Sequence, residues 1–254
     1  MLTALHHRLV VLEGASNFRD LGGYRTDDGR IVRSGHLYRA DGLDTLTSED
    51  LAVLRTKGLR TVIDLRSSHE IDERGRFPHE RHPVAWHHLS VLDKTWDRNG
   101  ALKRKQPASE FLVEAYSDML VEGAPRFAAA FGLLARDQAL PAVFHCAAGK
   151  DRTGLLAALL LGALGVPNEA IVHDYALTEL AMPAFLERMA NRYPDRQEEM
   201  AAIPPGFFSA TPQAMADTLT HLEADYGSIE AYLLNAGVSP GTLKTLNNRL
   251  TEPS

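Results

Sequence analysis

Residues 145–154 read HCAAGKDRTG, and this stretch decides the fold. Residues 142–146 form a short apolar run typical of a buried strand. Residues 153–164 are apolar almost throughout and predict a core helix. The sequence therefore predicts a strand, a tight loop and a helix in direct succession, with the loop following the end of the strand.

The loop itself has the properties of an anion cradle. Residues 147–152 contain no proline, so every backbone N–H is available, and a tight loop before a helix can aim these groups at one centre. Gly149 relieves steric limits where the chain curls. Arg152 can place a planar guanidinium across two oxygens of a phosphoryl group. The candidate substrate-binding residues are Ala147, Ala148, Gly149, Lys150 and Thr153.

Cys146 lies at the floor of this predicted cradle. A lone cysteine is ordinarily a small buried hydrophobe, but loop amides and a helix N-terminus favour its thiolate form at neutral pH. In-line attack on a phosphate ester would then form a phosphocysteine, with Arg152 stabilising the charge on the equatorial oxygens. We expect Thr153 to donate its hydroxyl to the sulfur and His145 to support the loop from beneath.

Composition excludes several other classes of protein. The chain has 254 residues, with 27 Lys and Arg against 33 Asp and Glu, and this net charge of −6 disfavours a protein that coats nucleic acid. A single cysteine excludes an intramolecular disulfide and a multi-thiolate zinc site. His87 and His88 are adjacent on a predicted strand and point to opposite faces, so we predict no metal site there.

The apolar segments are too short for membrane insertion or export. Residues 155–166 form the longest apolar run, which is below the roughly 18 residues expected for a bilayer-spanning helix. Residues 9–12 are too few for the apolar region of a signal peptide. We therefore expect a cytoplasmic protein without stable membrane insertion, although a leaderless export route stays open. The basic run 103–105 is a weak candidate for contact with a phosphoinositide membrane.

Apolar periodicity and turn residues predict the remaining elements. Glycine-rich turns in residues 1–40 indicate hairpins and loops, and a helix is expected from residue 51 to near Gly58. The other predicted elements are strands at 60–65 and 84–91, two helices in 109–135 broken near 123–125, and helices at 168–178, 183–191, 212–226, 228–235 and 240–250.

The HCAAGKDRTG stretch resembles the signature loop of the cysteine-based protein tyrosine phosphatases. More narrowly, Lys150 and Asp151 before the arginine, together with NFRDLGGY at 17–24 and DLRS at 64–67, resemble bacterial atypical phosphatases of broad or triple specificity. The resemblance covers most of the chain. It implies an α/β fold, in which helices flank a central, mainly parallel sheet, as a single phosphatase domain over 1–254 with a C-terminal helical lid at 179–211.

The resemblance also implies an activity. Members of this family hydrolyse phosphotyrosine, often phosphoserine and phosphothreonine, and phosphoinositides, without a metal or other cofactor. A lysine at the position of Lys150 is implied to favour highly anionic head groups. The alternatives are a phosphoinositide phosphatase and a non-catalytic phosphate-binding protein, and the oligomeric state is left open.

The proton donor to the leaving group has three candidates. The sequence lacks the Trp-Pro-Asp loop of the better-known tyrosine phosphatases. The family pattern assigns an acid/base role to the position of Asp151, which is the first candidate. Asp93, after the predicted strand 84–91, is the rival. Asp64 is third, and an ion pair with Arg66 or Arg19 is its expected role.

Two further segments have a structural and a functional interpretation. Residues 17–24 could contribute Arg19 or Asp20 to the pocket, but a turn that supports the signature loop is favoured. Arg66 could add positive charge to the pocket, whereas its structural role would be an ion pair with Glu70, four residues on.

Overall fold

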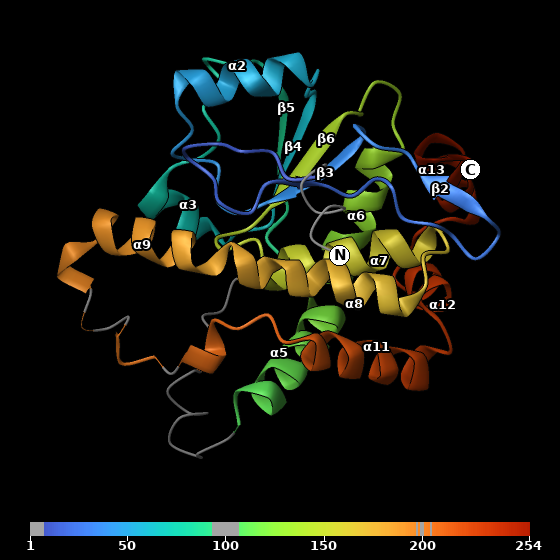
Figure 1. Ribbon diagram of the computed structural model, residues 1–254. Helices are drawn as coiled ribbons and strands as arrows, with labels where there is room; N and C mark the ends of the chain where they lie inside the picture. The colour runs from blue at the N-terminus through green and yellow to red at the C-terminus, as the bar shows by residue number, and fades with distance from the viewer. Residues whose placement is uncertain (1–7, 93–106, 197, 199–200, 204) are drawn as a thin grey trace.

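The computed structural model describes residues 8–92, 107–196, 198, 201–203 and 205–254. A five-stranded sheet of order β1-β3-β6-β4-β5 lies at its centre (Figure 1). The strands are β1 (Arg19–Asp20), β3 (Leu37–Ala40), β6 (Ala142–His145), β4 (Thr61–Asp64) and β5 (Ala85–His88). β1 runs antiparallel to β3, and the other three pairs are parallel. The predicted mainly parallel sheet is therefore confirmed.

Side chains of the central strands alternate between two hydrophobic cores. On β4 and β6, Val62 and Val143 belong to the smaller core, whereas Ile63 and Phe144 belong to the larger one. This alternation is the geometric consequence of pleating in a strand. The sheet is therefore the middle of three layers, as the α/β class requires.

Helices cover both faces of the sheet. α2 (Ser48–Thr56) packs on the smaller core through Leu51 and Leu54. The larger core takes residues from α5 (Ala108–Glu122), α6 (Ala124–Leu134), α7 (Asp151–Ala163), α8 (Asn168–Ala176), α11 (Pro212–Tyr226), α12 (Ile229–Asn235) and α13 (Pro240–Leu250). In Figure 1, α2 lies on one side of the sheet and this larger group on the other.

Five shorter or more peripheral elements complete the described part of the fold near the signature loop. α3 (Ser68–Arg74) follows β4, and α9 (Met182–Arg192) follows the 3-10 turn η1 (Leu177–Leu180). Two further 3-10 turns are η2 (Pro194–Arg196) and η3 (Pro205–Phe207). Within the described ranges, no helix is long and apolar enough to cross a membrane.

A second, small sheet joins a strand from the N-terminal part of the chain to the last strand of the fold. β2 (Arg30–Val32) pairs antiparallel with β7 (Thr251–Pro253), so that Val32 faces Thr251. The hairpin and loop prediction for residues 1–40 is therefore incomplete: β1 pairs antiparallel with β3 inside this range, but β2 finds its main partner in β7. Local turn signals cannot identify a partner more than 200 residues away, whereas the predicted helices 212–226 and 240–250 are found unchanged.

Candidate active site

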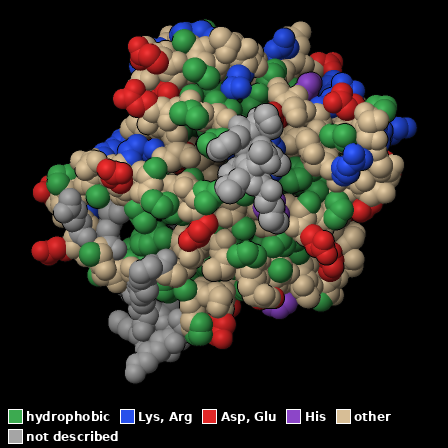
Figure 2. Space-filling model, in the orientation of Figure 1, with side chains coloured by type: hydrophobic (Ala, Val, Ile, Leu, Met, Phe, Trp, Pro, Cys, Tyr) green, Lys and Arg blue, Asp and Glu red, His purple; other side chains and the backbone are tan. Residues whose placement is uncertain are grey.

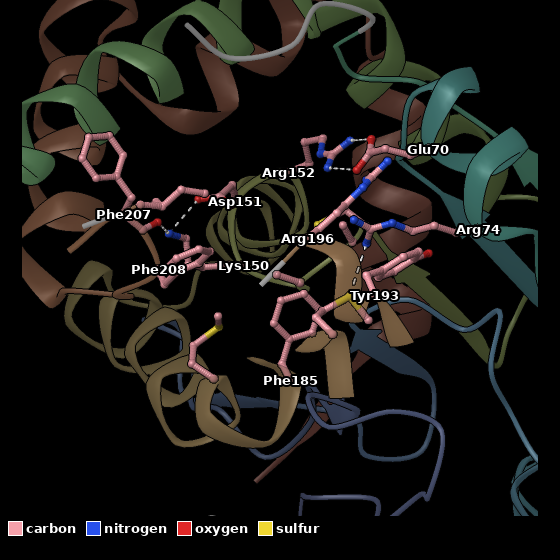
Figure 3. A pocket seen from close by; sticks show the side chains of 16 residues that line it. Glu70, Arg74, Lys150, Asp151, Arg152, Phe185, Tyr193, Arg196, Phe207 and Phe208 are labelled. Atoms are coloured by element: carbon pink, nitrogen blue, oxygen red, sulfur yellow. Dashed lines mark hydrogen bonds and ion pairs between the residues drawn. The ribbon is translucent and has the colours of Figure 1, made fainter. Parts of the chain in front are cut away.

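The signature loop leaves the central strand β6 and enters the N-terminus of α7. At its start, Cys146 is 1% exposed and lies in a cavity of about 270 Å³. The loop residues that line this cavity with it are Ala147, Ala148, Lys150, Asp151 and Arg152. The predicted nucleophile and guanidinium therefore share one pocket, shown in Figure 3.

The loop carbonyls are bound from outside the pocket. The Gly42 amide donates to the Ala147 carbonyl at 3.0 Å, and Asn17 Nδ2 donates to the carbonyls of Ala148 and Gly149 at 3.1 and 3.2 Å. Across a trans peptide the C=O and the following N–H point in opposite directions. The amides of residues 148–150 therefore point away from Gly42 and Asn17.

Gly149 permits the sharpest bend of this loop. Its φ is +67°, a region that favours glycine, and a Cβ at this position would lie 2.6 Å from the Ala40 carbonyl oxygen. Gly149 does not itself line the cavity; it packs against the end of β3. Its role is therefore to let the loop approach the sheet closely.

A buried ion-pair network holds the outer side of the loop. Arg39 donates from Nη1 to Asp174 at 2.5 Å and from Nη2 to the Gly149 carbonyl at 2.7 Å. Arg19 Nε donates to the same carboxylate at 3.2 Å. Burial alone would raise the pKa of Asp174, but the two arginines hold it well below its ordinary value. Within segment 17–24 the support for the loop comes from the Asn17 side chain and from Arg19 in this network. The turn at Gly22 and Gly23, which was predicted to brace the loop, lies against Ser34 instead.

Arg152 forms a two-point ion pair with Glu70, which was expected from the sequence to pair with Arg66. Its Nη1 and Nη2 donate to the two carboxylate oxygens of Glu70 at 2.5 and 2.9 Å (Figure 3). Burial alone would lower the pKa of Arg152, whereas Glu70 and the nearby Cys146 raise it above its ordinary value. A guanidinium has five N–H donors. Glu70 accepts from two of them.

The predicted ion pair between Arg66 and Glu70 is wrong. Arg66 instead donates from Nη2 to Asp64 at 2.7 Å and from Nη1 to Asp44 at 3.1 Å. Glu70 is oriented by its own helix, because it closes a capping box in which the Ser67 amide donates to Oε2 at 2.8 Å. The Ser-x-x-Glu pattern at residues 67–70, directly after a predicted strand, is the sequence signal that would have indicated this capping box.

Asp151, the first candidate for the proton donor, lines the cavity and has a tyrosine partner. Tyr116 donates its hydroxyl to Asp151 Oδ1 at 2.6 Å, and the Tyr175 hydroxyl lies 2.6 Å from that of Tyr116. Burial and the nearby Asp151 carboxylate raise the pKa of Tyr116 well above its ordinary value. Tyr116 therefore stays protonated and fixes one oxygen of the carboxyl group.

The other two candidates lie in different situations. Asp64 is fully buried and is not among the residues lining the cavity. Burial alone would raise its pKa, but the hydrogen bonds and charge of Arg66 lower it, so the carboxyl remains ionised in its structural pair. Asp93 lies outside the described residues.

Lys150 connects the signature loop to the connection before α11. Its ammonium donates to the carbonyls of Phe207 at 2.7 Å and Ser209 at 3.2 Å, and it lies 3.3 Å from Asp151 Oδ1. The residue is 2% exposed. In this structure its charge is therefore directed at the backbone over the pocket as well as at a neighbouring carboxylate.

The predicted auxiliary roles of Thr153 and His145 are found only in part. The Thr153 hydroxyl is buried and has no hydrogen-bond partner in the described chain, so the expected bond to sulfur is not formed. His145 lies beneath the loop, with Nε2 3.5 Å from Asp64. Burial lowers the pKa of His145, which therefore packs there as a neutral ring.

The opposite wall of the cavity comes from the segment predicted as a lid. Its lining residues are Met182, Phe185, Met189, Tyr193, Arg196, Ile203, Phe207 and Phe208. α9 supplies the first three of these. In Figure 2, hydrophobic side chains border the hollow beside α9, and basic side chains gather where α3 and α9 approach each other. The lid segment thus gives the pocket a largely apolar wall, to which Arg196 and, from α3, Glu70 and Arg74 add charge.

Comparison with known proteins gives a consistent result. Residues 10–252 match the family model described as tyrosine phosphatase family. A Cupriavidus necator protein assigned as a tyrosine-protein phosphatase is 31% identical over 233 residues, which cover 89% of this chain and 83% of that protein. The triple specificity protein phosphatase PtpB of Mycobacterium tuberculosis is 26% identical over 273 residues, covering 94% and 98%. A tyrosine-protein phosphatase of Nostoc commune is 30% identical over 230 residues, covering 84% and 73%.

Proposed function

Because the chain belongs to the tyrosine phosphatase family, we propose that it hydrolyses phosphotyrosine in proteins through a phosphocysteine on Cys146. One observation carries this proposal: Cys146 and Arg152 line the same cavity, and the loop amides of residues 148–150 point away from the groups that bind the loop carbonyls. Such an arrangement stabilises the equatorial oxygens of a phosphoryl group during transfer.

The reaction proceeds in two displacements. The Cys146 thiolate attacks phosphorus while the bond from phosphorus to the tyrosyl oxygen breaks, and Asp151 gives its proton to that oxygen. Water then attacks the phosphocysteine, Asp151 accepts the proton of this water, and inorganic phosphate leaves as the bond from sulfur to phosphorus breaks. The hydrogen bond from Tyr116 fixes the Asp151 carboxyl for both proton transfers.

Broad specificity is the second part of the proposal. A relative that matches nearly the whole chain is named a triple specificity phosphatase. We therefore include phosphoserine and phosphothreonine as substrates. Phosphoinositides remain the alternative substrate class; the present direction of the Lys150 ammonium, toward the carbonyls of Phe207 and Ser209, favours the protein substrate.

The organisation and location of the chain belong to the same proposal. We propose one phosphatase domain over residues 1–254 in which 179–211 form a helical lid. The match of the family model to residues 10–252 supports the single domain. The cytoplasmic location remains a prediction, which cell fractionation tests.

Phosphate release from a phosphotyrosine peptide and from phosphoinositide vesicles tests the function. We expect faster release from the peptide. Cys146→Ser should bind the peptide without turnover, whereas Arg152→Ala should lose both binding and turnover. A trapped phosphocysteine in the wild type excludes a non-catalytic phosphate-binding protein. Turnover by Cys146→Ser would overturn the mechanism.

The proton donor is identified by its dependence on the leaving group. Asp151→Asn should slow hydrolysis of an aryl phosphate with a poor leaving group by about 100-fold or more, and a good leaving group should restore most of the rate. Asp93→Asn is the matched comparison. If Asp93→Asn shows this pattern and Asp151→Asn does not, the assignment passes to Asp93.

A further inference from the structure

Three arginines surround one tyrosine on the wall of the catalytic cavity. The guanidinium carbons of Arg74, Arg192 and Arg196 lie 5.8, 5.4 and 5.6 Å from the centre of the Tyr193 ring. Arg74 ends α3, Arg192 ends α9, and Arg196 belongs to η2. Figure 3 shows Arg74, Tyr193 and Arg196 on the same side of the pocket as Arg152 and Glu70.

The charges of these arginines are compensated unequally. Arg192 pairs with Asp44, and Arg196 pairs with Glu73 at 2.5 Å. For Arg74 no carboxylate lies within ion-pair distance among the described residues; its Nη1 instead contacts the Met189 sulfur at 3.8 Å. Arg74 therefore brings to the cavity wall a positive charge that has no direct ion-pair partner among the described residues, although the nearby Glu70 carboxylate interacts with this charge.

Two buried donors on this wall also lack partners. Arg74 Nε and the Tyr193 hydroxyl oxygen are both buried, and neither has a hydrogen-bond partner in the described part of the chain. Buried polar groups in native proteins are almost always satisfied, so an unpaired N–H and an unpaired O–H beside the Arg74 guanidinium require an explanation. An anionic group of a ligand would accept from both.

The position of these donors limits the ligand to one that also reaches the signature loop. Arg74, Tyr193 and Arg196 line the same cavity of about 270 Å³ as Cys146 and Arg152. The apolar side chains of Phe185, Met189 and others from the lid segment line the same cavity. An aryl phosphate fits this lining, with its phosphate on the loop and its ring against the apolar side chains.

Building on the proposed function, we propose that Arg74, Tyr193 and Arg196 form a second anion subsite that selects phosphotyrosine peptides with an acidic side chain next to the phosphotyrosine. The carboxylate of that neighbour accepts hydrogen bonds from Arg74 Nε and the Tyr193 hydroxyl. The exposed Arg196, paired with Glu73, adds positive charge at the entrance.

Competition between two peptides tests this subsite. The peptides differ only beside the phosphotyrosine, where one carries Glu and the other Gln. For the wild type we expect kcat/KM to be about tenfold higher with Glu, the size of one hydrogen-bonded charge pair. Arg74→Met and Tyr193→Phe should reduce this ratio toward one. Arg74→Glu should reverse the preference in favour of a peptide with Lys at that position.

Arg76→Met is the matched control. Arg76 is exposed, lies two residues from Arg74 and stacks on Trp86 at 5.6 Å, and it does not line the cavity. This variant should keep the wild-type ratio. Equal ratios in the wild type and Arg74→Met would overturn the subsite, as would phosphoinositide hydrolysis that depends on Arg74 while peptide hydrolysis does not. Failure to release phosphate from either peptide would instead contradict the proposed function.

Discussion

Glu70 and Arg152 form a two-point ion pair that joins α3 to the signature loop, with nitrogen to oxygen distances of 2.5 and 2.9 Å. The pair holds the guanidinium in one orientation before any substrate arrives. Preorganised charge of this kind lowers the cost of stabilising a transition state. Glu70 is therefore expected to act as a positioning residue for catalysis.

Glu70→Gln should lower kcat/KM for an aryl phosphate by about tenfold, the effect of losing one charge-assisted contact. Steady-state kinetics measure this loss. Asp72→Asn, an exposed change on the same helix, should leave the rate unchanged. If Glu70 merely competes with phosphate for Arg152, Glu70→Gln would instead bind phosphate more tightly and react faster.

The same pair predicts a specific pH dependence of stability. Burial alone would raise the pKa of Glu70, but the hydrogen bonds and charge of Arg152 lower it from its ordinary value of 4.5 to about 2. The native carboxylate thus stays ionised at pH values where the unfolded chain binds a proton. Its contribution to the free energy of unfolding is complete above pH 4.5 and is lost as the pH falls toward 2.

Urea unfolding of the wild type and Glu70→Gln from about pH 7 to about pH 3 tests this dependence. The wild type should be more stable near neutrality, and the difference in unfolding free energy should shrink in acid. Comparison between the two proteins removes the effect of other buried carboxylates. A difference that stays constant over this range would contradict the assigned shift.

Gly149→Ala should abolish most of the phosphatase activity. A Cβ there would lie 2.6 Å from the Ala40 carbonyl oxygen, so the loop must move away from β3 and the amides lose their common centre. Gly58→Ala is a close control, because Gly58 has the same φ of +67° but no atom within 4 Å of the added carbon.

Thermal unfolding and kcat distinguish the two glycine variants. Both should lose about 1 kcal/mol of stability from backbone strain. Gly58→Ala should keep the wild-type kcat. Equal loss of kcat in the two variants would show that strain anywhere in the chain, rather than the close contact of the loop, limits activity.

Asp174→Asn should strongly destabilise the protein. It leaves Arg19 and Arg39 buried with less compensation, and removing one partner of a buried ion pair costs about 3–5 kcal/mol. Chemical unfolding measures this cost. Asp137→Asn breaks an ion pair with Arg249 in which the aspartate is 91% exposed, and it should cost less than about 1 kcal/mol. Similar losses in the two variants would contradict the importance of burial.

The sequence predicted those features that depend on local pattern. The strand predicted at 142–146, the loop and the following helix are adjacent in the sequence, so their order could be predicted. The same adjacency places Cys146 and Arg152 in one pocket. Helices bounded by proline and glycine were predicted closely, because these residues constrain the backbone directly. The resemblance of the loop supplied the family, which the match over residues 10–252 confirms.

Contacts between segments that are distant in the sequence could not be predicted from local sequence patterns. Glu70 was expected to pair with Arg66, four residues away, but the capping box turns its carboxylate toward Arg152 on another element. The ion pair of Asp174 with Arg39 joins α8 to β3, which are far apart in the sequence. A helical spacing rule considers only neighbours on one helix, so it cannot rank such tertiary partners.

Lys150 couples the charge in the pocket to the backbone above it. The ammonium has three N–H donors, and the carbonyls of Phe207 and Ser209 and the carboxylate of Asp151 surround it. A phosphate oxygen that bound Lys150 would therefore have to replace one of these three acceptors.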